Sequence, residues 1–74
     1  MITVYKKPNC MQCAYAVKYL EKNNIEFNTI DVTQDEEALN YIKYVLGYQA
    51  VPVVVSSTEH WYGFQPDKLA KLVG

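Results

Sequence analysis

Two cysteines separated by two residues, Cys10 and Cys13, stand between a short apolar run and a helical pattern. Residues 1–5 are mostly β-branched or aromatic and predict a strand, whereas residues 14–23 predict a helix. Cys10 is therefore expected at a helix N-terminus, where free backbone N–H groups and the helix dipole stabilise a thiolate. Cys13, one turn further on, is placed to attack a mixed disulfide formed at Cys10. A pair in this position predicts a thiol–disulfide redox site.

Three other roles for the cysteine pair are weaker. A structural disulfide that closes so short a loop removes little chain entropy. Zinc needs about four ligands, and beyond the cysteines the chain offers only His60 and scattered carboxylates, so a metal would need a second chain. We expect no metal, and we expect His60 to be an ordinary strand residue. An inert pair of buried thiols is the third alternative.

Length and composition predict a single small domain over residues 1–74. Half of the residues are hydrophobic and seven are tyrosine, which is enough to build a core. The net charge of −1 gives no electrostatic reason to bind nucleic acid or a membrane. No stretch approaches the ~20 apolar residues of a membrane span, and the N-terminal run, which ends at Lys6, lacks the features of a signal peptide. We therefore expect a cytoplasmic monomer with no bound cofactor.

Charged residues are unevenly distributed along the chain. Four of the seven lysines lie in residues 1–24, and five of the eight acids lie in residues 25–37. Lys7, in the loop before the cysteines, is expected to stabilise the Cys10 thiolate, with a solvated loop lysine as the alternative. The chain contains no arginine, so no guanidinium group can bind a carboxylate through two parallel hydrogen bonds.

The middle of the chain predicts a strand followed by a helix. Residues 25–32 have the composition of a strand, and Thr33 with Glu36 has the form of a capping box that opens a helix. Gly47 is expected to end this helix. The helix has an apolar stripe, around which three tyrosines are expected to pack: Ala38, Leu39, Ile42, Val45 and Leu46 form the stripe, and Tyr41, Tyr44 and Tyr48 surround it.

The last third of the chain predicts a hairpin and a short helix. Residues 51–55 predict a strand, and because Pro52 cannot donate a ladder hydrogen bond, it is expected at the first residue of that strand or on an edge of the sheet. Residues 59–62 form the antiparallel partner strand, and Pro66 opens a last helix that carries Leu69, Leu72 and Val73. The whole order, β-α-β-α-β-β-α, predicts an α/β fold with a four-stranded mixed sheet and three helices on its two faces.

This order, with a Cys-x-x-Cys pair before the first helix and a proline opening the third strand, resembles the minimal thioredoxin fold of the glutaredoxins. Four segments resemble more narrowly the NrdH-type redoxins: residues 5–13 (YKKPNCMQC), 47–50 (GYQA), 52–54 (PVV) and 61–67 (WYGFQPD). The resemblance implies a dithiol that donates electrons to the large subunit of a class Ib ribonucleotide reductase. It also implies reduction by thioredoxin reductase, with electrons that come from NADPH.

The resemblance also implies roles for individual residues. Cys10 would be the nucleophile and Cys13 the resolving thiol of a redox-active disulfide. Pro52 would be a cis proline that faces the disulfide and turns the backbone of Val51 toward a partner. The remaining partner-binding residues would be Lys7, Met11, Gln12, Trp61, Tyr62, Gly63 and Phe64.

The segment from Trp61 to Phe64 is expected to form an exposed apolar rim beside Cys10. The alternative is that Trp61 and Phe64 fill the core under the last helix. The chain departs from the family pattern at Tyr62, where a serine is usual, and at Gln65, where an arginine is common. Both departures lie in the segment that the resemblance assigns to partner binding, and they concern partner choice rather than chemistry.

Two alternative functions remain beside the electron donor. A glutathione-dependent glutaredoxin would need cationic or N–H-rich sites for two carboxylates, but the chain lacks arginine and places bulky Phe64 after Gly63. A regulatory module would use the same cysteine pair as a redox sensor without turnover. Catalytic disulfide reduction with a recycling reductase distinguishes the two redox carriers from the sensor.

Overall fold

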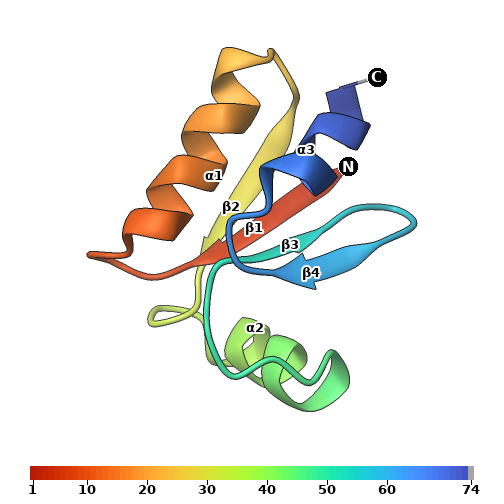
Figure 1. Cartoon of the computed structure of the whole chain (residues 1–74). Helices are drawn as coiled ribbons and strands as arrows, with labels where there is room; N and C mark the ends of the chain where they lie inside the picture. The colour runs from red at the N-terminus through yellow and green to blue at the C-terminus, as the bar shows by residue number, and fades with distance from the viewer. Residues whose placement is uncertain (74) are drawn as a thin grey trace.

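The computed structural model describes residues 1–73 and contains a four-stranded mixed sheet with helices on both faces (Figure 1). The predicted fold class and element order are confirmed. Gly74 and the side chain of Val73 lie outside the described residues. The elements are β1 (Ile2–Lys6), α1 (Met11–Lys22), β2 (Phe27–Asp31), α2 (Glu36–Asn40), η1 (Tyr41–Val45), β3 (Val53–Val55), β4 (His60–Tyr62) and α3 (Pro66–Val73).

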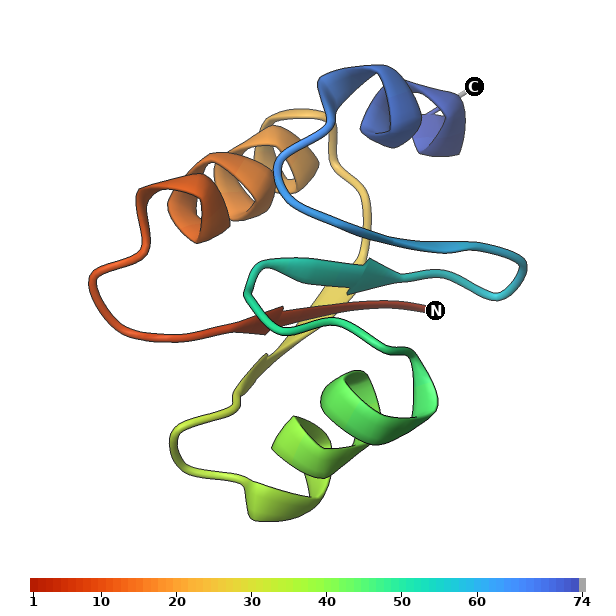
Figure 2. The same ribbon diagram turned by 60° about the horizontal axis from the view of Figure 1, so that its bottom comes forward.

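The strands lie in the order β2-β1-β3-β4, so the first strand of the chain is at the centre of the sheet. β1 pairs with β2 in parallel and with β3 in antiparallel orientation, and β3 and β4 form an antiparallel hairpin. Helices α1 and α3 cover one face of the sheet, and α2 with η1 covers the other (Figure 2). None of the helices in residues 1–73 is long and apolar enough to cross a membrane.

Successive residues of the two central strands point into two separate cores, because side chains alternate along a strand. Val4 and Val54 belong to the core under α1 and α3, and their neighbours Tyr5 and Val53 belong to the core under α2 and η1. The first core is completed by Leu20, Trp61 and Leu69, and the second by Val32, Ala38 and Ile42. The continuous apolar sequence of β3 follows from this burial on both faces.

The start of α2 differs from the prediction. Asp35 is the N-cap, and its carboxylate accepts a hydrogen bond from the N–H of Ala38 at 3.0 Å. Thr33 instead donates its N–H and its hydroxyl to the carboxylate of Asp31, at 2.8 and 2.6 Å. These hydrogen bonds, the hydroxyl bond foremost, lower the pKa of Asp31. The expected capping box led by Thr33 is therefore wrong.

The segment after α2 widens into the π-helical turn η1. The N–H of Leu46 donates to the carbonyl of Tyr41, five residues back, at 3.1 Å. A wider turn changes which side chains face the sheet, and Val45 and Tyr44 are 69% and 74% exposed. The expectation that Val45 belongs to the apolar stripe is therefore wrong, and Tyr44, expected to pack around the stripe, faces solvent.

The rest of the predicted stripe is partly confirmed. Ala38 and Ile42 are buried, whereas Leu39 is 39% exposed. Tyr41 packs against Tyr5 with ring centroids 5.9 Å apart. Gly47 follows the helical segment with a φ of +82°, as expected for a residue that ends a helix.

Candidate active site

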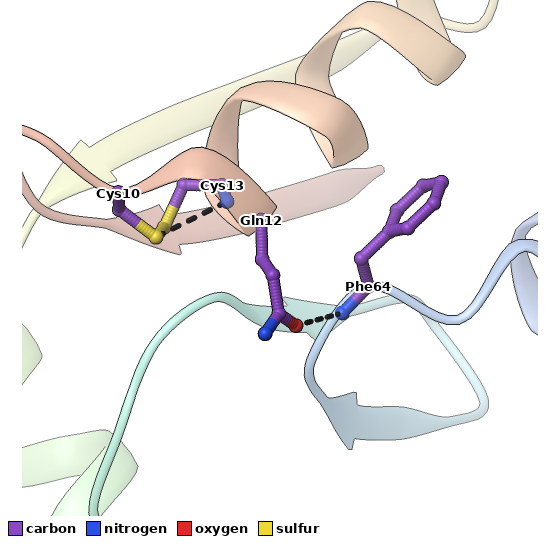
Figure 3. Close-up of a disulfide and its surroundings, with 4 residues drawn as sticks. All are labelled: Cys10, Gln12, Cys13 and Phe64. Atoms are coloured by element: carbon purple, nitrogen blue, oxygen red, sulfur yellow. Dashed lines mark hydrogen bonds between the residues drawn. A yellow bond between two sulfur atoms is a disulfide. The ribbon is translucent and has the colours of Figure 1, made fainter.

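Cys10 is the N-cap of α1, and its extended backbone (φ −110°, ψ 109°) places the sulfur over the first turn of the helix. Cys10 and Cys13 form a disulfide with their Cα atoms 5.2 Å apart (Figure 3). The N–H of Cys13 donates to the Sγ of Cys10 at 3.1 Å. The same N–H is placed to stabilise a thiolate at Cys10 after reduction.

The two cysteines differ in accessibility. Cys13 is only 2% exposed, whereas Cys10 is half-buried. Cys13 faces the core together with Ala16 and Leu20 of the same helix. The expectation that Cys13 is the more buried sulfur is confirmed. A partner therefore reaches the disulfide through Cys10.

An open pocket of about 540 Å³ lies beside the disulfide and is lined by Lys7, Cys10 and Cys13. Lys7 is exposed to solvent. Glu21 lines the pocket as well and adds a negative charge. The structure thus places Lys7 in the pocket of the cysteines, together with an acidic side chain.

The Val51–Pro52 bond is cis, as expected. Pro52 is fully buried and Val51 is half-buried. The carbonyl of Pro52 accepts a hydrogen bond from the N–H of Gly63 at 2.8 Å. Val51 also lines a second pocket of about 280 Å³, which has Lys7 and Lys43 at its edge and a largely apolar wall.

Residues 62–65, which we call the partner loop, are tied to the first turn of α1. The side-chain oxygen of Gln12 accepts a hydrogen bond from the N–H of Phe64 at 3.1 Å (Figure 3). Gln65 donates its side-chain amide to the carbonyl of Tyr62 at 2.8 Å and closes the loop on itself. Gly63 has a φ of +88°, a conformation that L side chains rarely adopt.

Trp61 does not form the exposed rim expected from the sequence. It is 3% exposed and belongs to the core under α1 and α3. Gly63 is also buried, whereas Tyr62 is 44% exposed and Phe64 is half-buried. The alternation along β4 explains the difference, because Trp61 faces the core when His60 and Tyr62 face solvent. The alternative, in which Trp61 fills the core, is the correct one.

Two aromatic residues beside the site were not predicted from the sequence. The ring of Phe64 packs against Tyr15 and Tyr19, with centroids 5.8 and 6.5 Å apart. With Met11, which is 69% exposed, these tyrosines follow one another at a spacing of four along α1. This spacing of four is the sequence feature from which a row of large apolar side chains along α1 could have been predicted.

His60 lies in β4, as expected of an ordinary strand residue, and its side chain also contacts Tyr48. The hydroxyl of Tyr48 lies 2.8 Å from the Nδ1 of His60, and the two rings meet edge to face. This contact joins the segment before Pro52 to β4. It lies outside the cysteine pocket.

Comparisons with known proteins agree with this fold and site. A glutaredoxin family model matches residues 2–61, and the chain belongs to the glutaredoxin family. The solved NrdH-redoxin of Escherichia coli superposes with a TM-score of 0.91 at 31% identity, over 96% of this chain and 92% of that chain. The thioredoxin-like protein BC3987 superposes with a TM-score of 0.90 at 35% identity, over 97% of this chain and 99% of that chain.

One relative shows that the similarity extends to a narrower group of proteins within this family. Over 72 residues the chain is 39% identical to the glutaredoxin-like protein NrdH of Lactococcus lactis subsp. cremoris. The matched residues make up 97% of this chain and 99% of the relative. The resemblance to NrdH-type redoxins is therefore confirmed. The family and the Cys10–Cys13 disulfide together define a thiol–disulfide oxidoreductase.

Proposed function

We propose that this chain is a cytoplasmic dithiol electron carrier that reduces a class Ib ribonucleotide reductase and is itself reduced by thioredoxin reductase. The similarity to NrdH-type proteins supports the proposal. The E. coli relative is described as having a thioredoxin-like activity profile. In this proposal NADPH supplies the electrons, and the carrier binds no cofactor of its own.

The reaction consists of two thiol–disulfide exchanges. The Cys10 thiolate attacks one sulfur of the partner disulfide, which forms a mixed disulfide and releases the other partner sulfur as a thiolate. Cys13 then loses its proton and attacks the Sγ of Cys10. The Cys10–Cys13 disulfide forms, and the second partner sulfur leaves as a thiolate. Two electrons pass to the partner, and the two protons of the carrier thiols balance its two new thiols.

One observation carries the preference for a protein reductase over glutathione. The N–H groups of Gly63 and Phe64, beside the disulfide, are already bonded to Pro52 and Gln12 within the protein. A glutathione carboxylate at this loop would have to replace those bonds. Because the chain also has no arginine, the loop offers few groups that would hold a small anionic thiol.

The recycling system is tested by following NADPH oxidation with a disulfide substrate. We expect steady oxidation with thioredoxin reductase and little with glutathione plus glutathione reductase. The Cys10→Ser variant is the matched control and should be inactive with both systems. Turnover with glutathione alone would contradict the proposal.

The glutathione-dependent alternative has one observation in its favour. The pocket of about 280 Å³ beside Val51 has two lysines, Lys7 and Lys43, among its lining residues, and a lysine can bind a carboxylate. The Lys43→Ala variant separates the two functions. Under the proposal it leaves turnover with thioredoxin reductase nearly unchanged, whereas a glutathione enzyme that uses this pocket would lose activity.

The electron acceptor is identified by trapping. In the Cys13→Ser variant the resolving thiol is gone, so a mixed disulfide through Cys10 should accumulate. Mixed in its reduced form with the disulfide form of the large subunit of a class Ib ribonucleotide reductase, the variant should form a covalent complex that dithiothreitol reduces back to its components. A large subunit that is not trapped, although other protein disulfides are, would show that the assigned acceptor is wrong.

A further inference from the structure

Gln12 belongs to the dipeptide between the cysteines, but its side chain points away from the disulfide and toward the partner loop (Figure 3). Its oxygen accepts the N–H of Phe64 at 3.1 Å, across 52 residues of sequence. The carbon that a side chain at Gly63 would add lies 3.6 Å from the same oxygen. Gln12 is thus bonded to Phe64, and a side chain at the preceding residue would meet the same oxygen.

Two hydrogen bonds fix the partner loop, one to the proline of the cis bond and one to a residue between the cysteines. Gly63 donates its N–H to Pro52, next to the cis bond, and Phe64 donates its N–H to Gln12, between the cysteines. A loop fixed at two neighbouring N–H groups has little freedom to shift relative to the disulfide. Loss of either bond would leave it anchored on one side only.

The position of the loop determines where the Phe64 ring lies. The ring packs against Tyr15 and Tyr19 of α1, and Tyr15 is 45% exposed. Met11, at the start of the same helix, is 69% exposed. These side chains form a partly exposed apolar surface that begins at the residue next to Cys10.

We propose that Gln12 is a positioning residue: by accepting the Phe64 N–H it fixes the partner loop, and so sets the apolar surface that a protein disulfide meets beside Cys10. The inference deepens the proposed function, since it rests on a protein rather than glutathione being the substrate. Gln12 takes no part in the exchange of sulfur atoms. Its effect is on recognition.

The test compares a protein disulfide with a small one. Insulin, kept turning over with dithiothreitol, is the protein disulfide, and 5,5′-dithiobis(2-nitrobenzoate) is the small probe. In the second reaction the two thiols become the Cys10–Cys13 disulfide while the probe is cleaved to two thionitrobenzoate ions. Because neither assay contains a reductase or ribonucleotide reductase, failure of the proposed partners and failure of this inference give different results.

Three variants isolate the hydrogen bond. Gln12→Met keeps the length of the side chain and removes the amide oxygen, whereas Gln12→Glu keeps an oxygen acceptor. Tyr15→Ala removes the surface on which the Phe64 ring lies. Tyr44→Ala is the matched control, because Tyr44 is a 74% exposed tyrosine on η1, on the opposite face of the sheet.

We expect the Phe64 amide proton to exchange about two- to tenfold faster in Gln12→Met, the range that one hydrogen bond of ordinary net strength gives. The ratio of the insulin rate to the small-probe rate should fall by about the same factor, mainly through KM. Gln12→Glu should restore the amide protection and most of the ratio. Tyr15→Ala should lower the ratio with normal protection, and Tyr44→Ala should change neither.

Three results would overturn the inference. Unchanged amide exchange in Gln12→Met would show that the bond does not hold the loop in solution. Faster exchange with an unchanged ratio would show that the loop position does not matter for a protein substrate. Equal losses toward insulin and the small probe would show that Gln12 acts on the cysteines themselves.

Discussion

Cys10 and Cys13 belong to the same helical turn, yet only Cys10 is accessible to a partner. The N-cap position sets this difference, because it leaves the first sulfur at the surface and turns the second toward the core. The same position directs the N–H of Cys13 at the Sγ of Cys10. One short segment therefore provides an accessible first sulfur and a buried second sulfur, as the proposed exchange requires.

In the reduced protein, Cys10 should react with iodoacetamide at neutral pH at least about tenfold faster than Cys13, because it is both more accessible and better stabilised as a thiolate. Peptide mapping after a short alkylation pulse measures both rates. The Cys10→Ser and Cys13→Ser variants assign the two signals. Equal rates at the two cysteines would refute the assigned roles.

Trp61 should act on stability rather than on partner binding. Trp61→Ala removes a large side chain from the core under α1 and α3 and should lower the free energy of unfolding by about 3–5 kcal/mol. Trp61→Phe should cost much less, since it keeps a ring and removes an indole N–H that is buried without a hydrogen-bond partner. Urea denaturation measures the free energy of unfolding of both variants. Equal losses of stability in the two would contradict the placement of Trp61 in the core.

Without the family resemblance, which predicts the cis bond at Pro52, the site residues could be predicted from the sequence only where the signal is local. The roles of Cys10 and Cys13 follow from spacing and from position at a helix start. The resemblance predicts Trp61 at the surface, whereas in the folded strand His60 and Tyr62 face solvent and Trp61 faces the core. The bond from Phe64 to Gln12 could not be predicted, because only the tertiary fold brings together residues that lie 52 positions apart.

At the scale of elements, the start of α2 is fixed by a carboxylate that accepts a hydrogen bond from an N–H group of the first turn. Asp35 caps the helix, and Glu36 and Glu37 occupy the first turn, where negative charge is favoured by the helix dipole. The acidic segment is thus explained by the helix start. It needs no ligand.

Asp35→Ala should lower the free energy of unfolding by about 1 kcal/mol, the usual cost of losing an N-cap. Asp35→Ser keeps a capping oxygen and should recover most of this loss. Thr33→Ala should cost less, because Thr33 only donates to Asp31. Urea denaturation of the three variants measures the ranking, and a larger loss for Thr33→Ala would restore the capping box expected from the sequence.

The order of the elements could be predicted because strand and helix periods are visible along the chain. The boundaries and the turn η1 could not. A π-helical turn inserts one extra residue without a distinct sequence pattern, and it changes the facing of the side chains around it. For this reason Val45, which fits the apolar stripe of an ordinary helix, is 69% exposed.

At the scale of the whole molecule, one sheet separates two cores. The core under α2 and η1 contains a buried tyrosine, Tyr5. Burial raises the pKa of Tyr5, and the nearby Tyr41 and Asp35 raise it further. A raised pKa means that the folded state holds this proton more tightly than the unfolded state. The resulting stability is complete below the unfolded value of about 10 and is lost as the pH rises through the folded pKa.

The stability of the protein should therefore decrease as the pH rises above about 10. The Tyr5→Phe variant cannot ionise at this position, so its stability should decrease less over the same range. Urea midpoints measured from about pH 8 to about pH 11 test the difference between the two slopes. Parallel slopes would show that Tyr5 ionises equally easily in the folded and unfolded chains.

The strand order also has a consequence for synthesis on the ribosome. β1 is made first, but it lies at the centre of the sheet, so one of its edges stays open until β3 is made. The cysteines and their helix precede both β3 and the partner loop. A growing chain therefore carries a reactive dithiol before it has the surface that we propose selects its partners, and its early chemistry depends on the redox state of the surrounding compartment.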